Sequence, residues 1–302
     1  MKNPLVTILL TTYNRAHLIG ETLDSILAQT YKNWECIIID DNSKDNTSTV
    51  VLSVMDKDHR FQFYKKPNEI PQGLPSSRNI GIKKAKGKFL VFFDDDDIVH
   101  PQLLEICIKE FFKNRSIDFV HYQKRSFQNK FIYSSMEKVK DYHTEILKDN
   151  IYENVIVGEL ALASCTVVWK TNLLQNNLFN QDLMYAEERE CYSRILITNN
   201  SIRGIKVNIP LYYNRKHQES NTGEFWSNHP LRLESYILAH QLICELLLSK
   251  NKISAKLANY FIQKSFHLKS KKIIHVLVSK HFRFKINSIL FPIKYNIYKL
   301  LK

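Results

Sequence analysis

The chain has 302 residues, of which 44% are hydrophobic and 24% charged, and this balance excludes disordered, collagen-like and low-complexity proteins. Its length is sufficient for one large domain or two of modest size. The net charge is +13, but residues 246–302 hold 13 basic and no acidic residues, so the rest of the chain, with 30 basic and 30 acidic residues, is neutral and unlike a nucleic-acid-binding body.

Strands and helices are predicted to alternate along the first half of the chain. The apolar, β-branched run at 5–12 predicts a strand buried on both faces, and apolar residues spaced three and four apart at 18–27 predict the helix that follows it. Further strands are expected at 34–39, 61–64, 89–93 and 118–122, and helices at 76–85 and 101–114. This alternation predicts an α/β fold with a parallel sheet and helices on both of its faces.

The second half has a weaker pattern. Residues 124–150 show no clear periodicity, and we interpret them as a hairpin and loops. Beyond them we expect a strand at 165–169, a helix at 182–199, a strand at 202–213 and only helices from 230 onward. The predicted domains are therefore residues 1–225, with halves 1–123 and 124–225, and a basic helical C-terminal extension, 226–302.

Five cysteines, at positions 36, 107, 165, 191 and 244, are widely spaced among apolar residues and form no CxxC pair. They are expected to be buried free thiols of a cytoplasmic protein. The first 15 residues are expected to form a strand, because they lack the cleavage site of a signal peptide, and no run of about 18 apolar residues predicts a membrane span.

Polar residues follow four of the predicted strands. In an open parallel sheet, ligands bind beyond the carboxyl ends of the strands, so these residues are expected to line a single cleft. They are Thr11, Tyr13, Asn14 and Arg15 after the first strand, Asp40 and Asp41 after the second, Asp94, Asp95, Asp96 and Asp97 after the fourth, and Arg215 and His217 after the late strand.

The run of four aspartates, Asp94 to Asp97, indicates a bound cation, because adjacent carboxylates repel one another unless a cation neutralises them. If the strand continues through the run, Asp94 and Asp96 share one side and Asp95 and Asp97 the other. Carboxylate oxygens suit Mg²⁺ or Mn²⁺ with phosphates as further ligands. The alternatives are a solvated acidic loop or a helix cap formed by Asp97.

Two residues near this edge are candidates for contacts with a nucleoside. Asp41 can accept hydrogen bonds from a base edge or ribose, and Tyr13 can offer a stacking face. The alternative for Asp41 is a helix cap, and for Tyr13 a core position. A dinucleotide or P-loop site is disfavoured, since the sequence has neither a GxGxxG motif after the first strand nor a P-loop motif.

Five segments occur in an informative order: LLTTYNR, IIIDDNSKDNT, GLPSSRNIGIKKAKGKFLVFFDDDD, AEERECYSRI and PLYYNRKH. Together they resemble family 2 of the inverting glycosyltransferases over about residues 4–220. The resemblance implies the GT-A nucleotide-diphospho-sugar transferase fold, with a mostly parallel central sheet flanked by helices. It also implies that residues 1–123 are the nucleotide-binding half and residues 124–225 the acceptor half.

The resemblance further implies roles for individual residues. Thr11, Tyr13, Asp41 and Arg78 match positions that bind the nucleobase and its surroundings, and Arg15 is placed in the same nucleotide-sugar site. The aspartates match the DxD element, with Asp94 or Asp95 at the ribose or a metal-bound water and Asp96 as ligand of Mn²⁺ or Mg²⁺.

The last two segments supply the remaining roles that the resemblance implies. Glu187 and Glu188 match a Glu-Asp pair whose second member is the general base, here the longer Glu188; the alternative is a solvated helix face. Arg215 and His217 resemble a motif that closes over the diphosphate, with His217 in the metal shell; the alternative for His217 is a lone surface histidine.

The resulting hypothesis is an enzyme that moves a sugar, with inversion, from a nucleotide-diphosphate donor to a hydroxyl group. The resemblance implies a UDP-sugar donor, a glycan or lipid-linked acceptor and a role in surface-polysaccharide synthesis, with no nucleic-acid partner. The alternatives are a nucleotidyltransferase on a similar sheet, which would release pyrophosphate, and a sugar-nucleotide-binding module without turnover. The sequence does not indicate an oligomeric state.

The end of the chain has an apolar stripe with lysines around it. Pro292 divides the stripe into two short helices. This pattern is typical of helices that lie on an anionic membrane surface, and the alternative is that they pack on the protein core. We therefore expect a cytoplasmic protein bound to the inner face of the cell membrane. The stripe comprises Ile286, Ile289, Leu290, Ile293, Ile297, Leu300 and Leu301.

Overall fold

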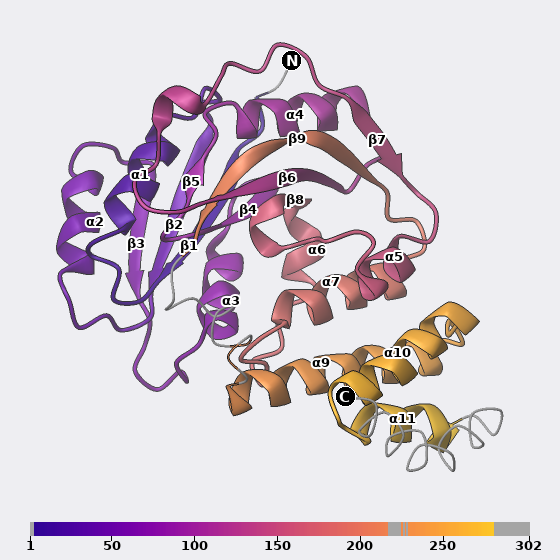
Figure 1. The fold of residues 1–302 in the computed structure, drawn as a ribbon. Coiled ribbons are helices and arrows are strands. Elements are labelled where there is room, and N and C mark those ends of the chain that lie inside the picture. Colours follow the sequence, from indigo (N-terminus) through magenta and orange to yellow (C-terminus); the bar gives the residue numbers. More distant parts are fainter. Residues whose placement is uncertain (1–2, 217–224, 226, 228, 281–302) are drawn as a thin grey trace. The chain divides into compact units, whose positions relative to one another are not determined.

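The computed structural model describes residues 3–216, 225, 227 and 229–280. The chain forms two compact units, which are described separately (Figure 1). Unit 1 comprises Met1–Asp149, Leu162–Gln181 and Ser201–Gly223, and unit 2 comprises Asn150–Ala161, Asp182–Asn200 and Glu224–Lys302. Unit 2 therefore includes two segments from within the predicted 1–225 domain.

The described part of unit 1 contains a nine-stranded sheet with the order β3-β2-β1-β4-β8-β6-β9-β5, and β7 pairs with β9. Strands β3, β2, β1 and β4 are parallel to one another, whereas β8 runs antiparallel to both β4 and β6. The strands are β1 Val6–Thr12, β2 Trp34–Asp40, β3 Phe61–Lys65, β4 Phe89–Asp94, β5 Ile98–Val99, β6 Phe119–Phe127, β7 Thr144–Leu147, β8 Val167–Lys170 and β9 Gly204–Arg215.

Helices cover both faces of this sheet. The described helices of unit 1 are α1 Ile19–Leu27, α2 Thr47–Met55, α3 Leu74–Lys84, α4 Leu103–Lys113 and α6 Thr171–Gln175, with short 3₁₀ turns at Tyr133–Ser135 and Ser164–Thr166. Alternate residues of a strand face opposite sides. Ile8 of β1 accordingly belongs to one core with Leu23 of α1 and Cys107 of α4, while the next residue, Leu9, contacts Gly81 of α3.

Unit 2 is helical in its described part. Its helices are α5 Ile151–Val157, α7 Glu187–Thr198, α9 Pro230–Ser249, α10 Ala255–His267 and α11 Lys272–Lys280. They share a core that includes Ile197 of α7, Leu247 of α9, Phe261 of α10 and Leu277 of α11. The described helices are too short or too polar to span a bilayer.

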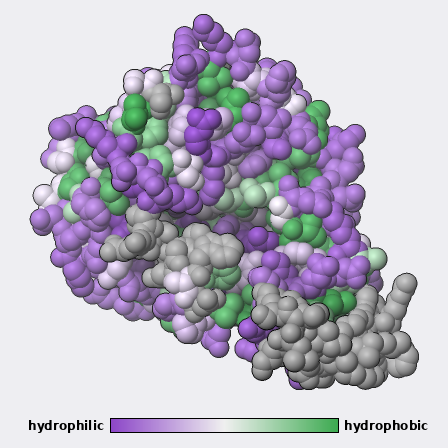
Figure 2. Space-filling model, viewed as in Figure 1, coloured by the Kyte–Doolittle hydropathy of each residue, from purple (hydrophilic) through white to green (hydrophobic). Residues whose placement is uncertain are grey.

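The elements predicted in the first half of the chain are confirmed, and so are the strand and helix between residues 165 and 199. The hairpin predicted within residues 124–150 is wrong, because β6 extends to Phe127 and β7 pairs with the distant strand β9. All five cysteines are buried and free, as predicted. The predicted apolar stripe at residues 286–301 lies outside the described residues. On the face shown in Figure 2, hydrophobic residues form small separate patches among hydrophilic ones.

Candidate active site

The carboxyl ends of three parallel strands in unit 1 lie side by side. In the sheet register, Thr11 of β1 stands opposite both Ile39 of β2 and Asp94 of β4. Residues that follow these strands therefore gather at one edge of the sheet, as the sequence predicted. Thr11 itself is half-buried at the end of its strand.

The four aspartates do not continue the strand. β4 ends at Asp94 and the next two residues form a turn, so the expected alternation of Asp94 and Asp96 against Asp95 and Asp97 does not occur. Instead, carboxylate oxygens of Asp94 and Asp97 and the Sγ atom of Cys165 lie within 4.8 Å of one another. The chain turns here because β5, which follows directly, pairs with β9.

Asp97 is the buried member of this aspartate turn, which comprises residues 94–97, and Asp95 is partly buried. Burial, with the nearby charges of Asp94 and Asp96, raises the pKa of Asp97 well above its usual range, and burial followed by the charge of Asp96 raises the pKa of Asp95 to about 7. Asp97 is only 3% exposed and accepts a hydrogen bond of 2.7 Å from the backbone N–H of Arg215. The alternatives of a solvated loop and a helix cap are therefore wrong for Asp97.

Two arginines face the aspartate turn. Arg78, predicted for the nucleotide-sugar site, is 3% exposed, and its Nη2 atom lies 3.6 Å from Oδ1 of Asp94 and donates to Ser164 Oγ at 2.9 Å. Arg15 lies farther out, with its Nε atom 3.7 Å from Oδ1 of Asp95. Both residues are thus brought to the predicted edge.

The carboxylate oxygens of the aspartate turn are ligand atoms that suit a hard divalent cation. Asp94 and Asp96 are half-buried carboxylates, and carboxylates that remain accessible to water suit Mg²⁺ or Mn²⁺. Burial raises the pKa of the Cys165 thiol well above its usual range, and a soft sulfur is not the ligand type that Mg²⁺ or Mn²⁺ prefers. Sequence reasoning recognised Cys165 only as a buried thiol, since nothing in its local sequence places it beside the aspartates.

Asp41 anchors a loop at the same edge. Its Oδ2 atom accepts a hydrogen bond of 2.8 Å from the N–H of Gly73, and its other oxygen forms an ion pair with the ammonium group of Lys66. Lys66 is 2% exposed and also donates to the carbonyl oxygen of Pro71 at 2.8 Å. The helix-cap alternative for Asp41 is therefore wrong. The sequence did not predict a role for Lys66, because this residue stands beside a second lysine in a polar segment.

Tyr13 is exposed at this edge. It has 42% of its surface accessible, so the alternative of a core tyrosine is wrong and its ring is free to stack. The next residue, Asn14, has a left-handed backbone with φ of 53°. Its N–H donates to Ser43 Oγ at 2.9 Å and its Oδ1 accepts from the N–H of Lys44 at 2.7 Å, which ties the loops after β1 and β2 together.

Arg215 braces the aspartate turn. Its Nε atom donates to the carbonyl oxygen of Asp96 at 2.9 Å, and its Nη2 atom lies 2.5 Å from Oε2 of Glu21. Tyr212, also in β9, adds a second support, since its hydroxyl oxygen accepts a hydrogen bond of 2.9 Å from the N–H of Asp94. His217, the other predicted residue of this motif, lies outside the described residues.

Glu188 belongs to unit 2, where it occupies the first turn of α7. Ala186 directly before this helix has a left-handed backbone with φ of 62°. Glu187 is 4% exposed, and Glu190 is 6% exposed and accepts a hydrogen bond of 2.7 Å from Nε of Arg194. The predicted alternative of a solvated helix face is therefore wrong for these two residues, and Glu188 is the more accessible member of the Glu187–Glu188 pair.

The parallel half of the sheet, with helices on both faces and polar residues at its carboxyl edge, defines an α/β protein of the kind that binds ligands beyond the ends of its strands. Solved structures place it in the GT-A fold. TarS of Staphylococcus aureus in complex with UDP-GlcNAc has a TM-score of 0.58 and 17% identity, covering 90% of this chain and 83% of that chain. The mannosyltransferase PcManGT of Pyrobaculum calidifontis with GDP-Man and Mn²⁺ has a TM-score of 0.55 and 16% identity, covering 99% and 84%.

The chain belongs to glycosyl transferase family 2, whose family model matches residues 7–171, and the predicted resemblance is confirmed. An uncharacterized glycosyltransferase of Rickettsia felis is 34% identical over 202 residues, which are 66% of this chain and 31% of that protein. The Escherichia coli UDP-Glc:alpha-D-GlcNAc-diphosphoundecaprenol beta-1,3-glucosyltransferase WfgD is 32% identical over 200 residues, 66% of this chain and 73% of WfgD. The match therefore spans about a third of the Rickettsia relative and most of WfgD.

Proposed function

We propose that this protein transfers a sugar from a UDP-sugar to a hydroxyl group of a glycan or lipid-linked acceptor in surface-polysaccharide synthesis. The aspartate turn carries the proposal, because it gathers acidic residues at the edge of the sheet where β1, which the exposed Tyr13 follows, pairs with β4. The name of WfgD, which gives UDP-Glc as donor and a diphosphoundecaprenol-linked sugar as acceptor, supports the same chemistry.

In this proposal the donor lies along the edge formed by β1, β2 and β4. The ring of Tyr13 stacks on the base, and Thr11 and Asp41 contact the nucleoside. Because Asp41 is already bound to Lys66 and Gly73, it holds a fixed position and offers only its remaining lone pairs. Arg78 and Arg15 add positive charge next to the phosphates.

Asp94 or Asp95 is proposed to contact the ribose or a water of the metal, and Asp96 to bind Mn²⁺ or Mg²⁺. When bound, the cation stabilises negative charge on the departing diphosphate. Arg215 and His217 are the further cationic candidates for the diphosphate. In the structure, the guanidinium of Arg215 donates to Glu21, to Asp96 and to the carbonyl oxygen of Asn129, so its remaining N–H groups are the ones available to a phosphate.

Glu188 is proposed as the general base. Its carboxylate accepts the proton of the acceptor hydroxyl as that oxygen bonds to the anomeric carbon, and the bond from this carbon to the diphosphate oxygen breaks in the same step. A single displacement inverts the anomeric configuration and requires no covalent intermediate. A nucleotidyltransferase would release pyrophosphate instead of a nucleoside diphosphate, so an assay of the products separates the two.

The Glu188→Gln variant tests the assignment. Removing a general base is expected to lower kcat by about 10²–10⁴-fold while UDP-sugar affinity, measured by calorimetry, stays the same. Glu245→Gln is the matched control, because Glu245 is an exposed carboxylate in the same unit. Retained turnover in Glu188→Gln, or loss of donor affinity, would contradict the role. Absence of any turnover in the unaltered protein with Mn²⁺ would favour a binding module.

The Asp96→Asn variant tests the metal site. It is expected to raise the Mn²⁺ concentration needed for half-maximal turnover by about tenfold or more, because a neutral amide is a weaker ligand than a carboxylate. Asp56→Asn is the matched control, since Asp56 is an exposed aspartate at the end of α2. A Mn²⁺ dependence that is unchanged in Asp96→Asn would argue against this ligand.

We also propose that the protein is cytoplasmic and binds the inner face of the membrane through its basic C-terminal extension. A chain that ends at residue 280 tests this, because it retains Leu257 and Phe261, which are buried in the core of unit 2. Unchanged sedimentation of this shortened chain with anionic liposomes would exclude a role for residues 281–302.

A further inference from the structure

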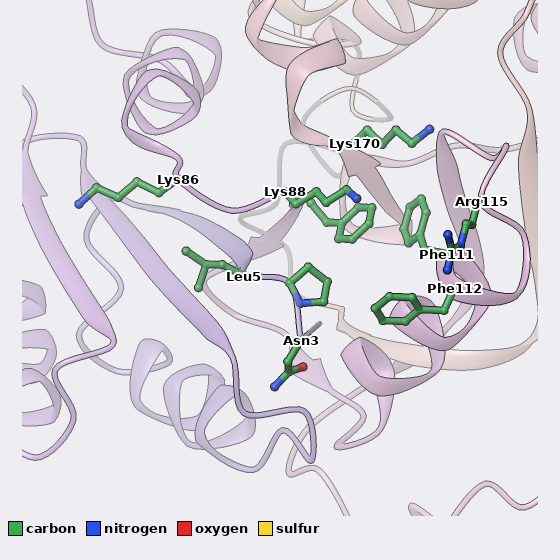
Figure 3. A pocket seen from close by; sticks show the side chains of 10 residues that line it. Asn3, Leu5, Lys86, Lys88, Phe111, Phe112, Arg115 and Lys170 are labelled. Atoms are coloured by element: carbon green, nitrogen blue, oxygen red, sulfur yellow. The ribbon is translucent and has the colours of Figure 1, made fainter. Parts of the chain in front are cut away.

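A cavity of about 670 Å³ lies at the opposite end of the strands from the aspartate turn. It is bordered by Leu5 before β1, Phe89 at the start of β4, Lys170 at the end of β8 and Arg115 after α4 (Figure 3). β1 and β4 are parallel, so both begin at the same end of the sheet. The cavity lies at that end, whereas the aspartate turn lies at the other end, where β4 finishes at Asp94. The size of the cavity is typical of a site for a small ligand.

The cavity is strongly basic. Its lining includes Lys86, Lys88, Arg115 and Lys170 and no acidic residue. Figure 3 shows Lys88, Lys170 and Arg115 around the aromatic side chains, whereas Lys86 points away from them. Lys170 is paired with a carboxylate outside the lining, its Nζ atom 2.9 Å from Oδ1 of Asp118. Among the described residues no carboxylate pairs with Lys88 or Arg115, so two positive charges remain without a counterion.

Phe89, Phe111 and Phe112 line the cavity next to these cations and form an aromatic wall. The rings of Phe89 and Phe111 are stacked with centroids 4.0 Å apart, and Phe112 beside them is half-buried. The Nζ atom of Lys88 lies 5.7 Å from the centroid of the Phe89 ring. A ligand here would thus meet positive charge and apolar surface at the same time.

The backbone around the cavity is held in place without a ligand. The N–H of Lys88 donates to the carbonyl oxygen of Leu5 at 2.8 Å, and the carbonyl oxygen of Lys88 accepts from the N–H of Thr171 at 3.1 Å. A Cβ atom on the preceding Gly87 would lie 2.4 Å from the backbone nitrogen of Thr7, so only glycine allows this close approach. The backbone that borders the cavity is therefore preformed, whereas the side chains of Lys88 and Arg115 are exposed and become ordered when a ligand binds.

We propose that this cavity binds an organic phosphate, with the phosphate group between Lys88 and Arg115 and the organic part against Phe112. A phosphate monoester carries a charge of about −1.5 to −2 at neutral pH and so matches the two unpaired cations, whereas a carboxylate would neutralise only one. The guanidinium of Arg115 suits the geometry of phosphate oxygens. Inorganic phosphate would leave the aromatic wall without a partner. This site is separate from the proposed donor site and does not depend on it.

Calorimetric titration of the full chain at fixed ionic strength tests the proposal with three ligands. They are inorganic phosphate, phenyl phosphate and monomeric dihexanoylphosphatidic acid, a lipid phosphate monoester, below its micellar concentration. At least one organic phosphate is expected to bind about tenfold more tightly than inorganic phosphate. Tighter binding of the phospholipid would identify a lipid headgroup as the source, and tighter binding of phenyl phosphate a soluble organic phosphate.

Variants of the lining complete the test. Lys88→Ala/Arg115→Ala is expected to weaken the organic phosphate by about tenfold or more, and Phe112→Ala to weaken it while leaving inorganic phosphate within about twofold. Lys57→Ala/Lys148→Ala removes two exposed lysines outside the cavity and is expected to change nothing. Equal affinity for organic and inorganic phosphate, or affinity unaffected by Lys88→Ala/Arg115→Ala, would overturn the proposal. The latter result would also be obtained if the ligand bound at the donor site.

Discussion

Ser235 of α9 fixes the segment that leads to Glu188. Its Oγ atom accepts a hydrogen bond of 2.9 Å from the N–H of Tyr185 and donates one of 2.7 Å to the carbonyl oxygen of the same residue. The serine is 5% exposed, so water has little access to replace these bonds. Ala186, the residue after Tyr185, has the left-handed backbone that directs the chain into α7. A non-glycine residue in this conformation costs about 1–3 kcal/mol, which the surrounding contacts must offset.

The Ser235→Ala variant removes both bonds. Two hydrogen bonds contribute about 2 kcal/mol in total, and the unsatisfied N–H and carbonyl of Tyr185 raise the expected loss of unfolding free energy to about 2–4 kcal/mol. If this clamp positions Glu188, kcat should fall by about 10–100-fold, with KM for the donor unchanged, because the base loses its orientation but the donor edge in unit 1 is untouched.

Urea unfolding and steady-state transfer assays on the same samples measure both effects. Ser249→Ala is the control, since Ser249 lies on the same helix but is exposed and donates only to the carbonyl oxygen of Leu246 at 2.8 Å. Ser235→Thr keeps the hydroxyl group and should recover most of the lost kcat. A Ser235→Ala protein with lower stability and unchanged kcat would refute the positioning role, leaving a purely structural serine.

Two further predictions concern stability. A Cβ atom on Gly204 would lie 2.2–2.6 Å from ring atoms of Phe119, so Gly204→Ala should lower the free energy of unfolding in urea by about 1–3 kcal/mol. Adding Phe119→Leu should recover part of this loss, and strictly additive effects of the two substitutions would contradict the clash. Burial lowers the pKa of His240 to about 3. Below pH 6.5 the unfolded chain therefore binds more protons than the folded protein, and the free energy of unfolding decreases as the pH is lowered. The slope approaches about 1.4 kcal/mol per pH unit and should be smaller in His240→Gln, whereas equal slopes in the two proteins from pH 7 to 5 would exclude this titration.

Hydrogen bonds give the physical basis of the His240 prediction. Nδ1 lies 2.8 Å from the carbonyl oxygen of Tyr236, which can only accept, so this nitrogen carries the proton of the neutral ring. Nε2 then accepts from the hydroxyl of Tyr260 at 3.0 Å. A second proton on Nε2 would remove that acceptor inside a site that is 0% exposed.

The sequence predicted the strands and the shared edge at which Tyr13, Asp41 and Asp94 stand at the ends of their strands, because both depend on local periodicity and on the rule for parallel sheets. It did not predict the pairing of Asp41 with Lys66. That contact depends on the path of the loop between β3 and α3, which returns to the sheet edge through hydrogen bonds such as the one from Lys66 to Pro71. Side-chain periodicity contains no information about such a path.

The aspartate turn shows a similar limit, and its contacts suggest how four adjacent acids divide their roles. Asp97 is buried, its side chain accepts from the N–H of Arg215, and its carbonyl oxygen accepts from Thr22 Oγ at 2.8 Å, so its contacts are those of a structural residue. Asp95 is partly covered and faces Arg15. Asp94 and Asp96 retain half-buried carboxylates at the edge. We therefore propose that Asp94 rather than Asp95 contacts the ribose or a metal-bound water and that Asp96 binds the metal, a register that the repeated residue alone left open.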